Sequence, residues 1–135
     1  MMLVFWTLQN PKCVEAMTAN KDMLEKNKEA WGWRVRFVGL STDAKAEDVK
    51  AKVEESGWSA IEHFKETDEN KASETWAITE SLHCVLIDKN GNITWRGNPS
   101  DINVEAEINK LVASEMENNG IDTFINLSAV EGQLQ

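Results

Sequence analysis

The amino-acid sequence predicts an α/β fold in which helices flank a mixed central sheet. In the first half of the chain, apolar segments of strand length alternate with amphipathic segments of helix length, which is the pattern of parallel βαβ units. In the second half, two strand-like segments flank Asn90-Gly91, a residue pair that favours a tight antiparallel turn. Parallel strands followed by an antiparallel hairpin give a mixed sheet.

The first strand–helix unit lies at the N-terminus. The apolar run from Met2 to Trp6 is rich in strand-forming residues and too short for a helix of its own. After a polar turn, Pro11 occupies the place where proline is favoured, the first position of a helix, and the helical pattern continues to about Ala30. Gly32 is suited to end this helix.

The second strand–helix unit follows directly. Residues Arg36–Leu40 predict a strand in the middle of the sheet, because the run becomes fully apolar. Thr42-Asp43 is a suitable N-terminal cap for a helix from Ala44 to Ser56, and Gly57 is a suitable stop. Two such units in succession predict right-handed crossovers and a parallel core.

The second half of the chain predicts a hairpin and one more helix. Residues Trp58–Phe64 form a strand-like segment, and the polar stretch Lys65–Thr75 indicates a loop. The strand predicted over Leu82–Asp88 should pair, across Asn90-Gly91, with a strand over Ile93–Arg96. A last helix is expected to begin near Asp101, after a proline.

The predicted domain covers residues 1–119, and residues 120–135 are expected to form a C-terminal tail, because no clear period continues beyond Asn119-Gly120. The 135 residues are 41% hydrophobic and 27% charged, as in ordinary globular domains. The net charge of −9 argues against nucleic acid or an anionic membrane as a partner, since both attract lysine and arginine.

Composition also bears on location. No apolar run approaches membrane-spanning length, so membrane insertion is not expected, and no basic segment precedes an apolar one as in a signal peptide. Two cysteines do not form a disulfide framework, which favours an intracellular reducing compartment, the cytoplasm or an organelle matrix. The sequence does not indicate an oligomeric state.

The segment Leu3–Cys13, LVFWTLQNPKC, joins the first strand to the first helix. The joint lies over the C-terminal edge of the strand, where ligands commonly bind in α/β sheets and where the helix dipole favours a thiolate at Cys13. Phe-Trp, a short turn and Pro-x-Cys resemble the active-site segment of the thioredoxin superfamily. The TlpA/tryparedoxin-like branch, with its motif F-W-x-x-W-C-x-x-C, is the most similar.

A second segment carries the same resemblance. Residues 84–97, CVLIDKNGNITWRG, are similar to the hairpin f-L-I-D-x-x-G-x-i-x-w-x-G of that branch. The two matches stand in the right order and cover Leu3 to about Val112. The resemblance implies a thioredoxin-like fold, with an active site at the start of the first helix.

The motif here is N-P-K-C and departs from C-x-x-C. On the family pattern, Asn10 takes the place of the attacking cysteine and Cys13 that of the resolving one. An asparagine amide can cap a helix but cannot act as a nucleophile. The cis-proline of the superfamily falls on Leu82, where a trans peptide is expected because a non-proline cis bond costs about 2.5–4 kcal/mol. Both departures indicate that disulfide exchange has been lost.

We therefore expect a thioredoxin-like module that binds a protein partner, or a subunit of a larger assembly, and that is not an active disulfide reductase. Cys13 is the candidate catalytic residue. The candidate binding residues are Asn10, Pro11, Lys12, Leu82 and Trp6, the last because tryptophan is enriched at interface hot spots. No cofactor is expected.

Two readings of Cys13 stay open. It can be a small buried hydrophobic residue, as free cysteines often are. It can also serve a single-cysteine redox enzyme, either a monothiol oxidoreductase or a protein similar to peroxiredoxins, whose motif T-x-x-C has the same spacing. In the peroxiredoxin-like case Arg96 would have to activate the thiol.

The second cysteine does not restore the chemistry. Strand alternation places Cys84 on the same face as Leu82 and His83 on the other face. A bond between Cys13 and Cys84 is not expected, because the geometry of the family does not favour it. His63 is the only other histidine and the spacing is unlike that of metal ligands, so no metal site is expected.

Overall fold

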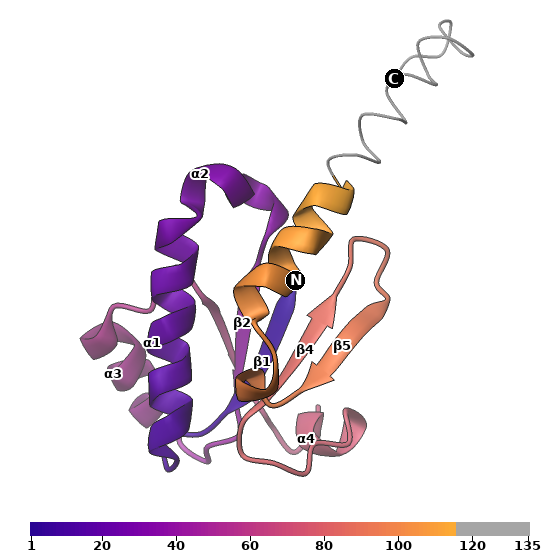
Figure 1. The fold of residues 1–135 in the computed structure, drawn as a ribbon. Helices are drawn as coiled ribbons and strands as arrows, with labels where there is room; N and C mark the ends of the chain where they lie inside the picture. Colours follow the sequence, from indigo (N-terminus) through magenta and orange to yellow (C-terminus); the bar gives the residue numbers. More distant parts are fainter. Residues whose placement is uncertain (116–135) are drawn as a thin grey trace, which may run out of the picture.

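The computed structural model describes residues 1–115, so the predicted boundary at residue 119 and the predicted tail, 120–135, lie outside the described residues. A five-stranded sheet in the order β3-β2-β1-β4-β5 forms the centre of this part of the chain (Figure 1). The strands are β1 (Met2–Trp6), β2 (Phe37–Ser41), β3 (Glu62–Lys65), β4 (His83–Ile87) and β5 (Ile93–Gly97).

The sheet is mixed, as the sequence predicts. β1 pairs in parallel with β2, and β2 with β3, whereas β4 is antiparallel to both β1 and β5. The predicted hairpin across Asn90-Gly91 is confirmed: Leu86 pairs with Trp95, and an irregularity follows between Leu86 and Ile87. Gly91 has φ +85°, the left-handed backbone that a turn of this kind requires.

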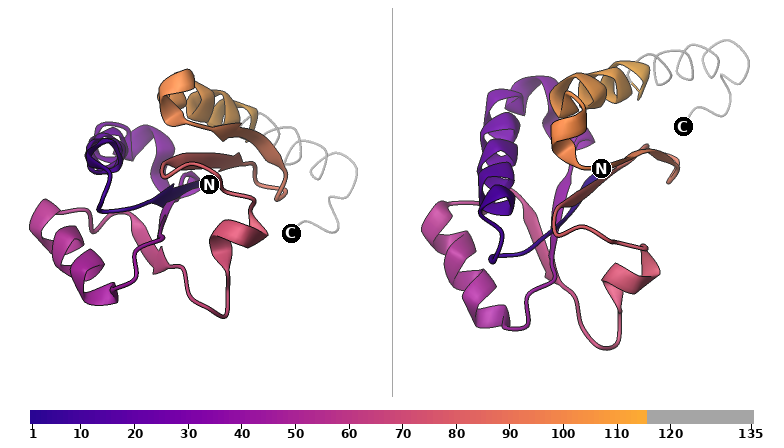
Figure 2. Two further views of the ribbon diagram at one scale, coloured as in Figure 1. Left: turned by 90° about the horizontal axis from the view of Figure 1, so that it is seen from below. Right: turned by 60° about the horizontal axis from the view of Figure 1, so that its bottom comes forward.

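Helices cover the sheet unequally (Figure 2). They are α1 (Pro11–Lys26), α2 (Lys28–Trp31), α3 (Ala46–Ser56), α4 (Ala72–Thr75) and a helix over residues 104–115, with short 3₁₀ turns at Gly32–Arg34 and Pro99–Asp101. Apolar residues of α1, α3 and helix 104–115 share one core cluster on one face of the sheet. On the other face, α4 and the chain around it pack against a smaller cluster. No helix within residues 1–115 is both long and apolar enough to cross a membrane.

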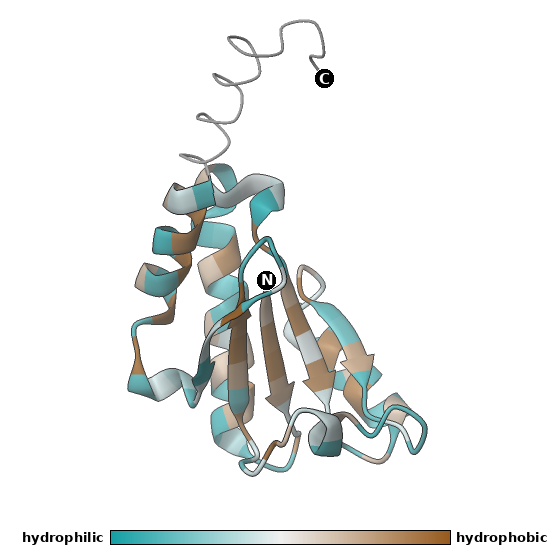
Figure 3. Cartoon of the chain, turned by 90° about the vertical axis from the view of Figure 1, so that its right-hand side faces the viewer, coloured by the Kyte–Doolittle hydropathy of each residue, from teal (hydrophilic) through white to brown (hydrophobic). Residues whose placement is uncertain are grey.

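The central strand is buried on both of its faces. All five residues of β1 are buried, and Figure 3 shows mostly hydrophobic colour along the central strands. Val4 and Trp6 belong to the cluster beneath α1, whereas Leu3 and Phe5 belong to the cluster on the α4 side. An uninterrupted apolar run is what a strand covered on both sides requires.

Three helix boundaries differ from the sequence prediction. The first helix is divided at Asn27, which is the C-terminal cap of α1 and whose side chain donates to the Met23 carbonyl (2.9 Å). The second helix begins at Ala46, two residues after the predicted Ala44, because the Asp43 side chain has other partners. The last helix begins at residue 104 and not near Asp101, which lies in a 3₁₀ turn.

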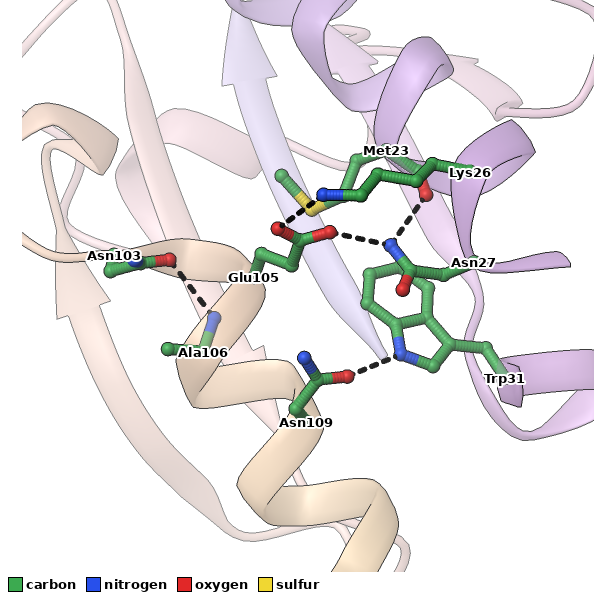
Figure 4. Close-up of polar contacts among 8 residues, drawn as sticks. All are labelled: Met23, Lys26, Asn27, Trp31, Asn103, Glu105, Ala106 and Asn109. Atoms are coloured by element: carbon green, nitrogen blue, oxygen red, sulfur yellow. Dashed lines mark hydrogen bonds and ion pairs between the residues drawn. The ribbon is translucent and has the colours of Figure 1, made fainter.

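Polar contacts fasten helix 104–115 to the corner between α1 and α2 (Figure 4). The Trp31 indole Nε1 donates to Asn109 Oδ1 at 2.7 Å, and the Trp31 ring packs against Phe37 with centroids 6.2 Å apart. Glu105 accepts from Asn27 Nδ2 (2.7 Å) and Lys26 Nζ (3.3 Å). Both hydrogen bonds lower the pKa of Glu105, and the one from Asn27 has the larger effect.

The two neighbouring tryptophans at this corner allow a matched test. Trp31 is 2% exposed and Trp33 is 76% exposed. We expect Trp31→Ala to lower the free energy of unfolding by about 3–5 kcal/mol through cavity formation. Trp33→Ala should cost about 1 kcal/mol or less, because it removes only a cation–π contact with Arg34. Chemical denaturation measures both, and equal losses would contradict the packing described.

Candidate functional site

The candidate site lies where β1 ends and α1 begins. The chain leaves the sheet after Trp6, and Asn10 adopts an extended backbone conformation as the N-terminal cap of α1. Its side-chain Oδ1 accepts from the Lys12 N–H at 3.0 Å, and Pro11 takes the first helical position. Asparagine and proline are favoured at these two positions, so the N-P-K-C segment forms a regular helix start.

One residue of the loop before β4 contacts both ends of this segment. Ser81 Oγ accepts from Asn10 Nδ2 at 2.6 Å, and the Ser81 carbonyl accepts from Cys13 Sγ at 3.2 Å. Residues 1–115 contain no cis peptide bond, so the expected trans Ser81–Leu82 peptide is confirmed. The first turn of α1 and the loop before β4 therefore form one hydrogen-bonded unit.

The two thiols lie in the core on the α1 face. Cys13 and Cys84 are each 0% exposed and neither forms a disulfide. Burial raises the pKa of Cys13; the Thr7 backbone opposes this shift and the Asp43 carboxylate adds to it. Burial, together with the nearby Cys13, raises the pKa of Cys84 to about 12. Both thiols are therefore protonated at neutral pH and shielded from solvent.

Asp43 organises the loop between β1 and α1, a role that the sequence did not reveal. Its carboxylate accepts from Thr7 Oγ1 (2.7 Å), from the Leu8 N–H (3.0 Å) and from Ser41 Oγ (2.7 Å). Asp43 is 8% exposed and does not cap α3, so the predicted capping role is wrong. The available signal was its position just after a buried strand, at the sheet edge where Thr7 also lies.

A groove of about 580 Å³ opens beside this unit, between α1, the loop before β4 and the 3₁₀ turn after β5. Its wall includes three of the predicted binding residues, Asn10, Lys12 and Leu82. Pro11 is exposed but does not line the groove. Trp6 is fully buried beneath the site, with its ring edge-on to Trp58 at 5.6 Å, so the structure places it in the core and away from the surface.

The opposite face of the sheet holds His83 and Arg96. Arg96 Nε donates to His83 Nε2 (3.1 Å), and Arg96 Nη2 donates to the Trp76 carbonyl (2.6 Å). The predicted separation of His83 from Cys84 is confirmed, and Arg96 lies across the sheet from Cys13, where it cannot activate that thiol. Within residues 1–115 no cluster of three or more histidine, cysteine or acidic side chains could hold a metal ion.

Comparisons with known proteins agree with this fold. A sequence model of the family described as thioredoxin-like matches residues 1–93. The chain belongs to the thioredoxin-like family. No curated protein sequence matches the chain.

Solved structures share the fold. They include a secreted Mycobacterium tuberculosis disulfide oxidoreductase homologous to Escherichia coli DsbE, at 20% identity and a TM-score of 0.62 over 84% of this chain and 79% of that one. A candidate thiol-disulfide oxidoreductase from Bacteroides vulgatus has 21% identity and a TM-score of 0.67, over 83% and 72%. A candidate thioredoxin from Neisseria meningitidis has 19% identity and a TM-score of 0.68, over 82% and 72%. At these identities the likeness shows the fold.

The Asp43 contacts predict a stability effect at the site. Asp43→Ala leaves the Thr7 hydroxyl, the Leu8 N–H and the Ser41 hydroxyl without their acceptor, so the free energy of unfolding should fall by about 2–4 kcal/mol. The exposed Asp22 on α1 provides the control, because Asp22→Ala should change the free energy of unfolding by about 0.5 kcal/mol or less. Urea denaturation measures both values. If the two variants unfold alike, the carboxylate does not organise the loop.

The buried thiols predict a pH dependence. A thiol whose pKa is raised by folding stabilises the protein below the unfolded pKa, and this contribution is lost as pH rises through the folded pKa. The free energy of unfolding should therefore decline above pH 9, because the Cys84 thiol ionises in the unfolded chain before it ionises in the folded one. Cys84→Ala should make that decline shallower than in the wild type. Thermal melts between pH 8 and 11 measure the slopes, and identical slopes would refute the assignment.

Proposed function

We propose that this thioredoxin-like domain binds a segment of a partner protein in the groove beside Asn10 and Leu82, and does so without exchanging disulfides. The arrangement of Asn10 supports the proposal most strongly. At the place that an attacking cysteine takes in the similar oxidoreductases, this chain has an amide held on both sides, by the Lys12 N–H and by Ser81 Oγ.

The state of Cys13 also supports a binding role. Thiol–disulfide exchange begins with an accessible thiolate, and a second thiol then releases the mixed disulfide. Cys13 Sγ is buried, donates to the Ser81 carbonyl and has a raised pKa, all of which favour the protonated form. Each of these features also disfavours a monothiol oxidoreductase or a peroxiredoxin-like enzyme that depends on Cys13.

The groove offers a surface for an extended partner. Its lining includes the exposed charged residues Lys12, Glu15 and Glu80, together with the half-buried Ala16 and the buried Leu82. Apolar residues at the centre with polar residues around them are typical of protein interfaces. The trans peptide before Leu82 changes the backbone that would face a disulfide substrate in the similar oxidoreductases, and this is consistent with recognition of a different partner.

Asn10→Cys tests the chemical half of the proposal. The introduced thiol would lie at the N-terminus of α1, where the dipole lowers its pKa, and Cys13 would be available to resolve a mixed disulfide. We expect the wild type to reduce insulin no faster than the background rate of the assay, and the variant to exceed that background rate at least tenfold.

Two controls make the outcome decisive. Asn10→Ser keeps a capping side chain without a thiol and should remain inactive. Asn10→Cys combined with Cys13→Ser should lose the gain, because no thiol remains to release the mixed disulfide. Turnover of a disulfide or a peroxide by the wild type, abolished in Cys13→Ser, would instead establish the single-cysteine enzyme.

A further inference from the structure

A second surface lies at the far edge of the sheet, on β3. This strand is outermost in the order β3-β2-β1-β4-β5, and it pairs in parallel with β2 through Val38–Glu62 to Ser41–Lys65. Within residues 1–115 no strand lies beside its outer edge. An edge of this kind presents backbone N–H and C=O groups to which another strand can add.

The hydrogen bonds between β2 and β3 show which backbone groups of β3 face away from the sheet. The Glu66 N–H donates to the Ser41 carbonyl at 2.8 Å, so the even-numbered residues of this segment direct their backbone groups toward β2. His63 and Lys65 consequently direct theirs away from the sheet. Asn70 Nδ2 donates to the Lys65 carbonyl (3.1 Å), which leaves the His63 N–H, the His63 C=O and the Lys65 N–H along the edge.

A groove of about 400 Å³ runs beside this edge, between β3 and α3. Val49 and Val53 of α3 supply apolar wall, and Phe64 borders the groove from the strand. Phe64 is 56% exposed, although large apolar side chains in a strand are ordinarily covered. The edge and the groove together resemble the site at which peptide-binding domains accept an added strand beside a helix.

The charges around the groove indicate the chemistry of its occupant. The groove is lined by two lysines, Lys50 and Lys65, and by one carboxylate, that of Glu54. This excess of positive charge is unusual in a chain whose net charge is −9. A strand added here would alternate its side chains between the α3 side and the Phe64 side. Two adjacent apolar residues would therefore contact Val53 and Phe64, and an acidic neighbour would complement the lysines.

A second copy of this chain fits the edge poorly. Symmetric antiparallel pairing with Phe64 on the two-fold axis sets Glu62 opposite Glu66 of the second copy, and like charges directly opposite each other are destabilising. With His63 on the axis, Phe64 lies opposite Glu62 of the second copy. The charge of −9 on each copy adds long-range repulsion.

We infer that the β3 edge and the groove beside α3 bind an extended segment of a partner protein that carries two adjacent apolar residues next to an acidic one. The segment adds a sixth strand to the sheet. This site is separate from the groove beside Asn10 and Leu82, so the inference does not depend on the proposed function.

The probe is a library of random nine-residue peptides displayed on phage, selected against the full chain. Selected peptides should share adjacent apolar residues beside aspartate or glutamate. Synthetic copies added to isotope-labelled protein should shift the amide signals of β3 and α3. A library that yields no binder, or binders that shift the signals around Leu82 instead, would overturn the inference.

Variants test the two kinds of contact. Phe64→Ser should lower the affinity for the selected peptide at least tenfold. The control is Ile93→Ser, which removes an exposed apolar side chain from the opposite edge strand and should change the affinity less than twofold. Lys65→Pro removes an outward N–H without touching the ladder to β2 and should weaken binding more than Lys65→Ala does. Circular dichroism verifies that each variant is folded.

Phe64→Ser without effect on affinity would overturn the inference. The same holds if sedimentation shows a concentration-dependent dimer of the wild type that Phe64→Ser abolishes, because the occupant would then be a second copy. A Lys65→Pro variant that binds as well as Lys65→Ala would rule out strand addition.

Discussion

The carboxylate of Asp43 joins two neighbouring strand ends, and the candidate site depends on it. β1 and β2 are parallel and end at the same edge of the sheet, where Thr42 also donates to the Trp6 carbonyl. Asp43 follows β2 and accepts from Thr7 and Leu8, which follow β1. The start of α1, and with it Asn10 and Cys13, is thereby placed by a buried polar contact at the sheet edge.

Ser81 extends this arrangement to a third segment. Its hydroxyl accepts from the Asn10 amide and its carbonyl accepts from the Cys13 thiol, so the loop before β4 is joined to the first turn of α1. A cysteine at position 10 would place a second thiol at the exposed end of this unit, whereas the asparagine adds a hydrogen bond across it. Under the proposed function, the side chain at position 10 decides whether this fold presents a reactive thiol or a fixed surface.

The sequence predicted the architecture because the architecture depends on local patterns. Apolar runs such as Met2–Trp6, the proline at position 11 and Asn90-Gly91 each determine a strand, a helix start or a turn from neighbouring residues alone. The roles of Asp43 and Ser81 at the site could not be assigned in this way, since the residues of the α1 start that they contact lie 35 to 71 residues away in the sequence. The sequence predicts a helix cap at Asp43 because aspartate is also favoured at that position. Trp6 shows the converse limit, since composition alone did not distinguish a core tryptophan from one at the surface.

The unequal covering of the two faces of the sheet has a kinetic consequence for Cys13. The α4 side is closed by a helix of four residues and the irregular chain around it, in which Lys71 and Ala77 have positive φ values of 42° and 54°. Segments with short helices and unfavourable backbone conformations belong to the low-stability end of local opening. This segment continues directly into Ser81, so a transient opening on the α4 side would withdraw the acceptor of the Cys13 thiol on the α1 side. The exposure of Cys13 to solvent then depends on the opening free energy of the opposite face as well as on the packing of α1.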